Sequence, residues 1–183
     1  MNDKAEKVYA EAFFELCLEE APDRLGDILG ELGALDGIFT ENGDFVKLLG
    51  TPTVPVDEKL GMMKEIIADG NISELTGNLL CVLTERGRMG CFCGIVKQFR
   101  DLYNEHFKIA EITVTSSSPL SEQMRDKITA KMSEVTGKTV SIKEKVDPEI
   151  IGGIVIDYGS TRYDGSIRAR LSGLKKELGG VIV

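Results

Sequence analysis

The period of the hydrophobic pattern changes near residue 107, and this change limits the folds open to the chain. Before it, apolar residues recur every three or four positions, the spacing of amphipathic helices. After it, AEITVTSSS at 110–118 and KTVSIKEKV at 138–146 alternate apolar and polar side chains and are rich in β-branched residues, as strands are. The sequence therefore predicts an α+β protein with a domain boundary at 107/108.

The first domain, residues 1–107, is expected to be an all-α six-helix bundle. A short segment precedes the prolines of Thr-Pro-Thr-Val-Pro at 51–55, which force an extended connection. The helices that the pattern predicts are 3–20, 22–37, 57–69, 72–85 and 89–107, and the short segment before the prolines covers residues 44–49.

The second domain, residues 108–183, is expected to be a small α/β-sandwich-like domain with a short sheet and two helices. Its order is strand 110–118, helix 119–137, strand 138–146, strand 150–158, a short return strand at 162–164 and a closing helix. We expect Ile167, Leu171 and Leu174 of the closing helix to pack on the sheet. The basic residues of this helix should face solvent or acidic partners; they are Arg168, Arg170, Lys175 and Lys176.

The charge distribution argues against nucleic-acid binding. The formal net charge is −8, and residues 1–105 hold 10 Lys and Arg against 20 Asp and Glu. An acidic surface repels phosphates. No run approaches the roughly 20 apolar residues that span a bilayer, and the first thirty residues resemble no targeting segment, so we expect a cytoplasmic protein with no membrane insertion.

The string Asp-Tyr-Gly-Ser-Thr at 157–161 resembles the first phosphate-binding loop of the sugar-kinase, heat-shock-protein and actin superfamily. That fold needs a second lobe and a second phosphate loop downstream, and only 26 residues follow Asp157. A hairpin explains the same residues, since Gly159-Ser160 is typical of a tight turn between two strands. The sequence therefore predicts a hairpin.

Other patterns that could indicate chemistry are also weak. Thr-Gly-Lys-Thr at 136–139 lies between a helix and a strand, the reverse of the order in a phosphate-binding P-loop. Cys81, Cys91 and Cys93 do not have the spacing or the number of ligands of a structural zinc site, and we interpret them as reduced thiols. With one histidine and no nucleophile–base set, the sequence predicts no catalytic, cofactor-binding or metal-binding residues.

The segment DPEIIGGIVIDYGSTRYDGSIRARLSGLKKEL at 147–178 resembles the C-terminal signature of the delta subunit of F-type ATP synthases, the bacterial counterpart of the mitochondrial oligomycin-sensitivity-conferring protein. The signature positions are Gly152, Gly153, Gly159, Asp164, Gly165 and Ser166. The segments 8–17, 83–105 and 112–123 are similar to other parts of the family's sequence, so the resemblance covers nearly the full chain.

The resemblance implies a non-catalytic stator subunit without cofactors. In this family the N-terminal bundle binds the N-terminal helix of alpha subunits on the catalytic head, and the C-terminal domain holds the b subunits of the peripheral stalk. The subunit lies peripherally at the cytoplasmic face of the bacterial cell membrane and is not a homo-oligomer in the complex. It resists rotation of the head during ATP synthesis.

The resemblance also implies where the alpha subunit binds. The family's groove lies between its first and fifth helices, which correspond to residues 3–20 and 72–85. The candidate residues are Tyr9, Phe13, Leu79, Val82 and Leu83. For Phe13 and Leu83 a place in the bundle core is the stronger interpretation, and Tyr9 and Val82 are the better candidates for binding.

Two alternatives remain. A free-standing helical adaptor predicts co-purification without any alpha or b subunit. An actin-like nucleotide-binding protein predicts micromolar nucleotide binding through Asp157 to Thr161.

Overall fold

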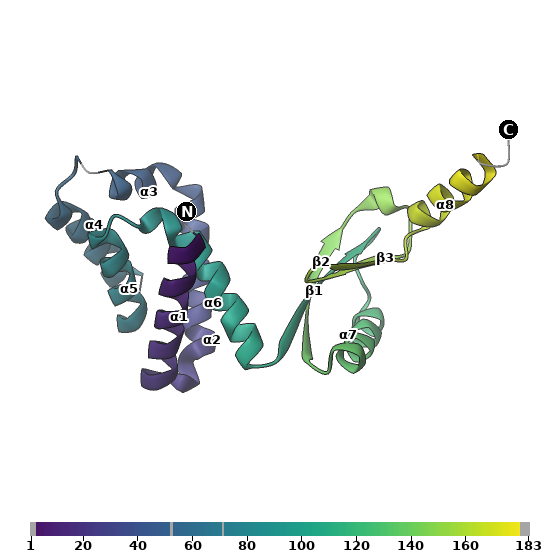
Figure 1. Ribbon diagram of the computed structural model, residues 1–183, viewed down its shortest axis with the longest axis horizontal. Helices are drawn as coiled ribbons and strands as arrows, with labels where there is room; N and C mark the ends of the chain where they lie inside the picture. The colour runs from purple at the N-terminus through teal and green to yellow at the C-terminus, as the bar shows by residue number, and fades with distance from the viewer. Residues whose placement is uncertain (1–2, 52, 71, 180–183) are drawn as a thin grey trace. The chain divides into compact units, whose positions relative to one another are not determined.

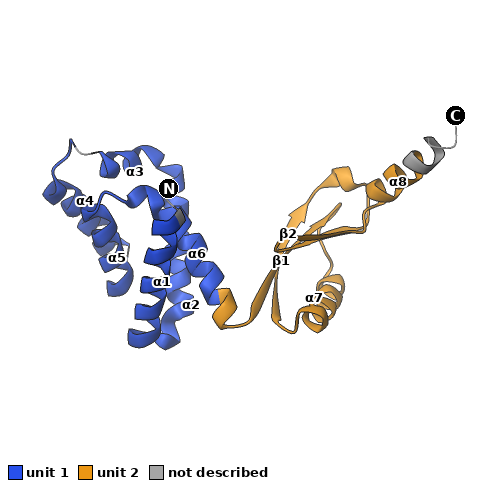
Figure 2. Ribbon diagram, in the orientation of Figure 1, with its two compact units in different colours: residues 1–103 blue, residues 104–183 orange. Residues whose placement is uncertain are grey.

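The computed structural model describes residues 3–51, 53–70 and 72–179, without the side chains of residues 3, 69 and 176–179. The chain divides into two compact units, residues 1–103 (unit 1) and 104–183 (unit 2), as Figure 2 shows. The division falls within the last turn of a helix that ends at His106, a few residues before the position of the change in periodicity.

Unit 1 is helical, and the prediction of six helices is confirmed for its described part (Figure 1). The helices are α1 Asp3–Glu20, α2 Leu25–Glu41, α3 Gly43–Gly50, α4 Val56–Asp69, α5 Glu74–Glu85 and α6 Phe92–His106. Two 3-10 turns, η1 Pro22–Arg24 and η2 Met89–Cys91, lead into α2 and α6. Gly87 makes the turn after α5 with a φ of +61°, a conformation that glycine adopts without steric cost.

Aromatic rings from α1, α2 and α6 meet in the core of unit 1. Phe99 is fully buried, and its ring centroid lies 5.5 Å from that of Phe13 and 5.3 Å from that of Phe14. Phe39 meets Phe92 edge to face at 5.2 Å. Since each buried aromatic side chain removes about 150–250 Å² from water, this cluster stabilises three helices against one another.

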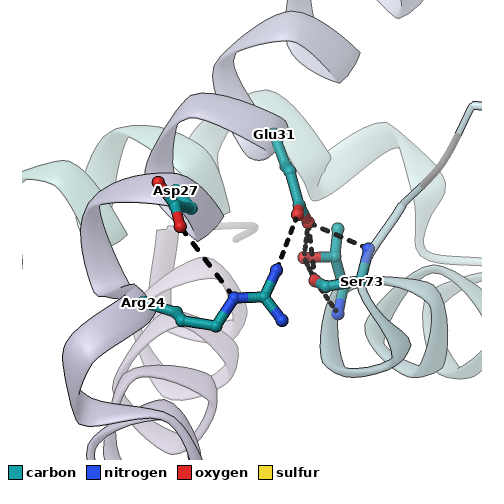
Figure 3. A network of polar contacts seen from close by, with 5 residues as sticks. Arg24, Asp27, Glu31 and Ser73 are labelled. Atoms are coloured by element: carbon teal, nitrogen blue, oxygen red, sulfur yellow. Dashed lines mark hydrogen bonds and ion pairs between the residues drawn. The ribbon is translucent and has the colours of Figure 1, made fainter.

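Helix α5 is attached to α2 by a carboxylate, as Figure 3 shows. Glu31 on α2 accepts hydrogen bonds from the Ser73 N–H at 3.2 Å, the Ser73 hydroxyl at 2.6 Å and the Thr76 hydroxyl at 2.9 Å. Ser73 is the N-cap of α5, and a guanidinium nitrogen of Arg24 lies 3.9 Å from Glu31. A carboxylate is stabilising at a helix N-terminus because the backbone N–H groups there carry partial positive charge. Glu31 therefore holds the start of α5 on α2.

Unit 2 contains a four-stranded sheet with the order β2-β1-β3-β4. Its elements are β1 Ile109–Ser116, α7 Glu122–Thr136, β2 Thr139–Val146, the 3-10 turn η3 Pro148–Ile150, β3 Ile154–Tyr158, β4 Thr161–Asp164 and α8 Ile167–Gly179. Strands β1 and β2 are parallel and are connected through α7, whereas the β1–β3 and β3–β4 pairs are antiparallel. The predicted α+β class, with a helical first part and a small sheet domain second, is confirmed.

The sheet has one apolar face, and α7 covers it. The buried residues of this interface are Ile112, Val114, Ile128 and Met132, surrounded by Leu120, Val140, Ile142, Ile154, Ile156 and Tyr158. Side chains alternate between the faces of a strand, so the residues between these positions point the other way. There the register places Thr113 beside Lys143 on β2 and Asp157 on β3, which makes the opposite face mainly polar.

Helix α8 does not cover the sheet, so the expectation that its apolar residues pack there is wrong. Ile167, Leu171 and Leu174 are 44%, 54% and 54% exposed. The physical reason is that α7 already fills the apolar face, and the polar face offers little apolar surface to a second helix. Figure 1 shows α8 continuing beyond the end of the sheet.

Replacing Glu31 by alanine is expected to lower the free energy of unfolding by about 1–3 kcal/mol, because the Ser73 and Thr76 donors lose their acceptor. Urea unfolding of the full chain measures this change. Asp27→Ala is the matched control. Asp27, which lies on α2 like Glu31, also approaches Arg24 but is exposed, so its loss should cost less than about 0.5 kcal/mol. Equal free energies of unfolding for the Glu31→Ala and Asp27→Ala variants would contradict the role of Glu31.

Candidate interaction surfaces

The string at 157–161 forms the predicted hairpin. Asp157 of β3 pairs with Arg162 of β4 in the strand register, and Gly159 lies in the turn between them with a φ of +56°. The Arg162 guanidinium donates from Nε at 2.7 Å and from Nη2 at 3.1 Å to the two carboxylate oxygens of Asp157. The carboxylate is thus engaged by the neighbouring strand, and the hairpin interpretation is confirmed. Gly137 similarly ends α7 in the left-handed conformation before β2 begins.

Five of the six signature residues meet where β4 leads into α8. Gly153 has a φ of +81°, and a Cβ atom built there would lie 2.4 Å from the Gly165 carbonyl oxygen. The Gly165 N–H donates to the Ile154 carbonyl at 2.9 Å, and the Ile167 N–H donates to the Gly152 carbonyl at 3.0 Å. Two stretches of backbone therefore pack directly against each other, which requires glycine at the contact.

Asp164 and Ser166 then start the helix. The Ser166 N–H donates to Asp164 at 2.9 Å, and the Ser166 hydroxyl accepts from the Ala169 N–H at 3.1 Å, as an N-cap does. The hydrogen bonds from Ser166 lower the pKa of the Asp164 carboxyl group. We call Gly152, Gly153, Asp164, Gly165 and Ser166 the α8 anchor. It determines the position and direction of the first turn of α8, whereas Gly159 belongs to the hairpin turn.

The exposed apolar residues of α8 lie on one face of the helix. Ile167, Leu171 and Leu174 follow one another at steps of four and three residues, the spacing of a helix–helix seam. We call these three residues the α8 stripe. Three exposed cations lie beside them in the sequence: Arg168, Arg170 and Lys175. Arg168 donates to Glu149 at 3.0 Å, an exposed pair, and the side chain of Lys176 lies outside the described ones.

The five residues predicted to bind an alpha subunit do not form one surface. Phe13, Leu79 and Leu83 are buried in the core of unit 1. Val82 on α5 is 42% exposed and Tyr9 on α1 is half-buried. The burial of the first three follows from their position on the inner side of α1 and α5, where they complete the core.

Tyr9 is linked to the turn that follows α5. Arg88 donates to the Tyr9 hydroxyl at 3.3 Å, and its guanidinium carbon lies 5.5 Å from the ring centroid. This is a hydrogen bond combined with a cation–π contact. It connects the outer part of α1 to the α5–α6 connection.

Sequence reasoning missed an exposed apolar row on α1. Val8, Ala12 and Leu16 follow one another at four-residue steps and are exposed, Val8 by 58%. Periodicity alone groups them with the inward-facing residues, although the apolar positions of this helix cover more than one stripe. That excess of apolar positions is the pattern that could have identified them.

The cysteines are not arranged as a reactive or metal-binding group. Cys17 and Cys91 are buried, and burial together with Glu20 and Glu31 raises the pKa of the Cys17 thiol to about 11. Burial also raises the pKa of Cys91 and Cys93. Within residues 3–51, 53–70 and 72–179, no three His, Cys, Asp or Glu side chains are grouped as metal ligands would be. Among the same residues, no helix has both the length and the apolar character that crossing a membrane requires.

Gly153→Ala is expected to lower the free energy of unfolding by about 2–4 kcal/mol, because the methyl group meets the Gly165 carbonyl and the backbone has a positive φ. Gly173→Ala is the matched control, since a Cβ atom there meets nothing within 4 Å and alanine favours a helix by about 0.5–1 kcal/mol. Denaturant unfolding of both variants distinguishes them. A Gly153→Ala protein as stable as the unaltered chain would contradict the close backbone contact.

Comparison with known proteins places both units in one family. Residues 5–178 match the family model of the ATP synthase delta (OSCP) subunit. The chloroplastic ATP synthase subunit delta of Emiliania huxleyi is 34% identical over 174 residues, which cover 94% of this chain and 95% of that protein. The ATP synthase subunit delta of Bradyrhizobium sp. strain BTAi1 is 32% identical over 91% of this chain and 89% of that protein.

The fold has a counterpart among solved structures. A chain in the cryo-EM structure of the Toxoplasma gondii mitochondrial ATP synthase hexamer superposes with a TM-score of 0.68 at 23% sequence identity, covering 94% of this chain and 96% of that chain. This likeness concerns the fold alone. The match of the family model across both units, with relatives above 30% identity over nearly the full length, shows that the chain belongs to the ATP synthase delta (OSCP) subunit family.

Proposed function

We propose that this chain, a non-catalytic stator subunit of an ATP synthase, links an alpha subunit to the peripheral stalk by a different surface on each of its two units. Unit 1 binds the N-terminal helix of an alpha subunit, and unit 2 binds the b subunits. The single observation that carries the proposal is the exposed α8 stripe of unit 2 in a chain whose family match includes both units.

The α8 stripe fits the apolar seam of a partner helix. Its steps of four and three residues are those of helices packed side by side, and the three side chains are about half exposed. Arg168, Arg170 and Lys175 make the flanks of the stripe basic, so a helix with acidic residues beside its own apolar seam is the complementary partner. We assign this partner to the C-terminal part of the b subunits.

The surface for the alpha subunit lies on unit 1. Tyr9 and Val82 are the two candidate residues that reach the surface, and Val8 adds exposed apolar area next to Tyr9 in the sequence. Phe13, Leu79 and Leu83 lie in the core, where they hold the backbones of α1 and α5 in place. An amphipathic helix with an apolar face is the kind of ligand that such a surface binds.

A subunit that holds the catalytic head on the peripheral stalk against rotation needs contacts that survive torque. Exposed ion pairs contribute about 0–1 kcal/mol each, and salt weakens them further. Apolar burial contributes about 25 cal/mol per Å² and does not depend on ionic strength in this way. Both proposed surfaces are therefore apolar at their centre. The complex would hold the subunit peripherally at the cytoplasmic face of the bacterial cell membrane.

Tyr9→Ala and Val82→Ala are each expected to weaken the binding of a peptide of the cognate alpha-subunit N-terminus by about fivefold or more, because each removes apolar contact area of about 1 kcal/mol. Titration calorimetry on the full chain measures the affinity. Ile38→Ala is the matched control, since Ile38 is an exposed apolar residue on α2 outside the proposed surface. Unchanged affinity of both variants would reject the assignment to unit 1.

Leu171→Asp and Leu174→Asp are each expected to weaken the binding of the soluble domain of the cognate b subunit by about 30-fold or more, since a charge in the seam would be buried without a partner. Their thermal stability should stay close to that of the unaltered chain because both positions are exposed. Val135→Asp on α7, at a position of similar exposure, is the control. Binding unchanged in the α8 variants and lost in the control would refute the surface.

A further inference from the structure

Ile151 occupies a backbone conformation that disfavours its side chain. Its φ is +68° and its ψ is −40°, near the γ-turn with positive φ, which is rare and strained. A β-branched residue with a positive φ is an outlier because its Cβ substituents meet the backbone. The described part of the chain contains one other non-glycine residue with a positive φ, Lys108, whose side chain is unbranched at Cβ.

The surrounding backbone imposes this conformation. The Ile151 N–H donates to the Pro148 carbonyl at 3.0 Å, which closes η3, and the next two residues belong to the α8 anchor. A Cβ atom at Gly153 would lie 2.4 Å from the Gly165 carbonyl oxygen, so the backbone of the anchor is closely packed there. The turn at residue 151 thus lies between a hydrogen-bonded 3-10 turn and a closely packed stretch of backbone, and both favour its conformation. Glycine occupies four other positions with a positive φ, which are Gly87, Gly137, Gly153 and Gly159, whereas position 151 holds an isoleucine.

The isoleucine side chain adds nothing to the core of its own unit. Ile151 is 61% exposed, whereas its neighbour Ile150 is buried. A glycine would relieve the strain, and a polar residue would suit the exposure. The side chain is thus unfavourable in the isolated chain on both counts, which indicates that its contacts lie in a complex.

The position of Ile151 is continuous with the α8 stripe. A Cβ atom at the adjacent Gly152 would lie 2.8 Å from Cδ1 of Ile167, the first residue of the stripe. Ile167 also donates its N–H to the Gly152 carbonyl. Ile151 is thus one residue away from a backbone contact with the first residue of the stripe, and the side chains of both Ile151 and Ile167 are exposed.

We propose that Ile151 is a hot-spot residue of the α8 docking surface, inserted into the apolar seam of the partner helix and kept in a strained conformation for that contact. This inference rests on the proposed function of α8. The partner is an amphipathic helix with acidic flanks, since the charges beside the stripe are basic at Arg168, Arg170 and Lys175. Hot-spot residues are the few that carry most of the binding energy of an interface.

Two substitutions at residue 151 separate the strain from the contact. Ile151→Ala removes the side chain and leaves a positive φ unfavourable, so affinity for the soluble domain of the cognate b subunit should fall at least tenfold without a rise in Tm. Ile151→Gly removes the side chain and the strain, so affinity should fall similarly while Tm rises by about 2–8 °C. Val135→Ala, which truncates an equally exposed residue on α7, should change neither quantity.

The outcomes are distinguishable. If the unaltered chain binds the b-subunit domain and Ile151→Ala binds it with an affinity within twofold of that value, the hot-spot role is overturned and the proposed function stands. A Tm of Ile151→Gly at or below that of Ile151→Ala overturns the strain. A folded, unaltered chain that does not bind the b-subunit domain at all overturns the proposed function of α8, and with it the hot-spot role.

Discussion

The sheet of unit 2 has one mainly apolar face, and the packing of α7 on that face leaves α8 little apolar surface in its own unit. The register of β1 with β2 and β3 places Thr113, Lys143 and Asp157 on the other face. Helix α8 is consequently held at its start, where Gly153 packs against the Gly165 carbonyl, and its leucines stay in contact with water. Exposed apolar area of this kind favours association, because a complex removes it from water.

In unit 1, by contrast, the helices bury most of their apolar residues within the unit. Its helices bury their apolar stripes against one another around Phe99, and α5 is fixed on α2 by the Glu31 carboxylate. Such a bundle can present a surface without rearranging its core, since Phe13 and Leu83 already support the helices from inside. A stator subunit that transmits force gains from this arrangement, because a close-packed interior deforms little under load.

Much of the fold could be predicted from local patterns. The change in periodicity near residue 107 separates helical from strand-like sequence, and the hairpin around Gly159 follows from its turn residues. The glycine-rich signature at 152–166 can be recognised from sequence, but its structural meaning cannot. Only the fold shows that Gly152 and Gly153 meet Gly165 and Ser166, since the two halves are separated by two strands.

The sequence by itself determined the order of helices and strands and the class of the fold, because periodicity and turn chemistry depend on neighbours within a few residues. The resemblance of residues 147–178 to a known signature identified the family. The tertiary structure decided which apolar residues are core and which are surface. Leu83 and Leu171 both belong to amphipathic helices, yet one is buried and the other is 54% exposed. A stripe of apolar residues indicates that a helix packs against a partner surface. Whether that surface belongs to the same chain depends on residues distant in sequence, as does the strained turn at Ile151.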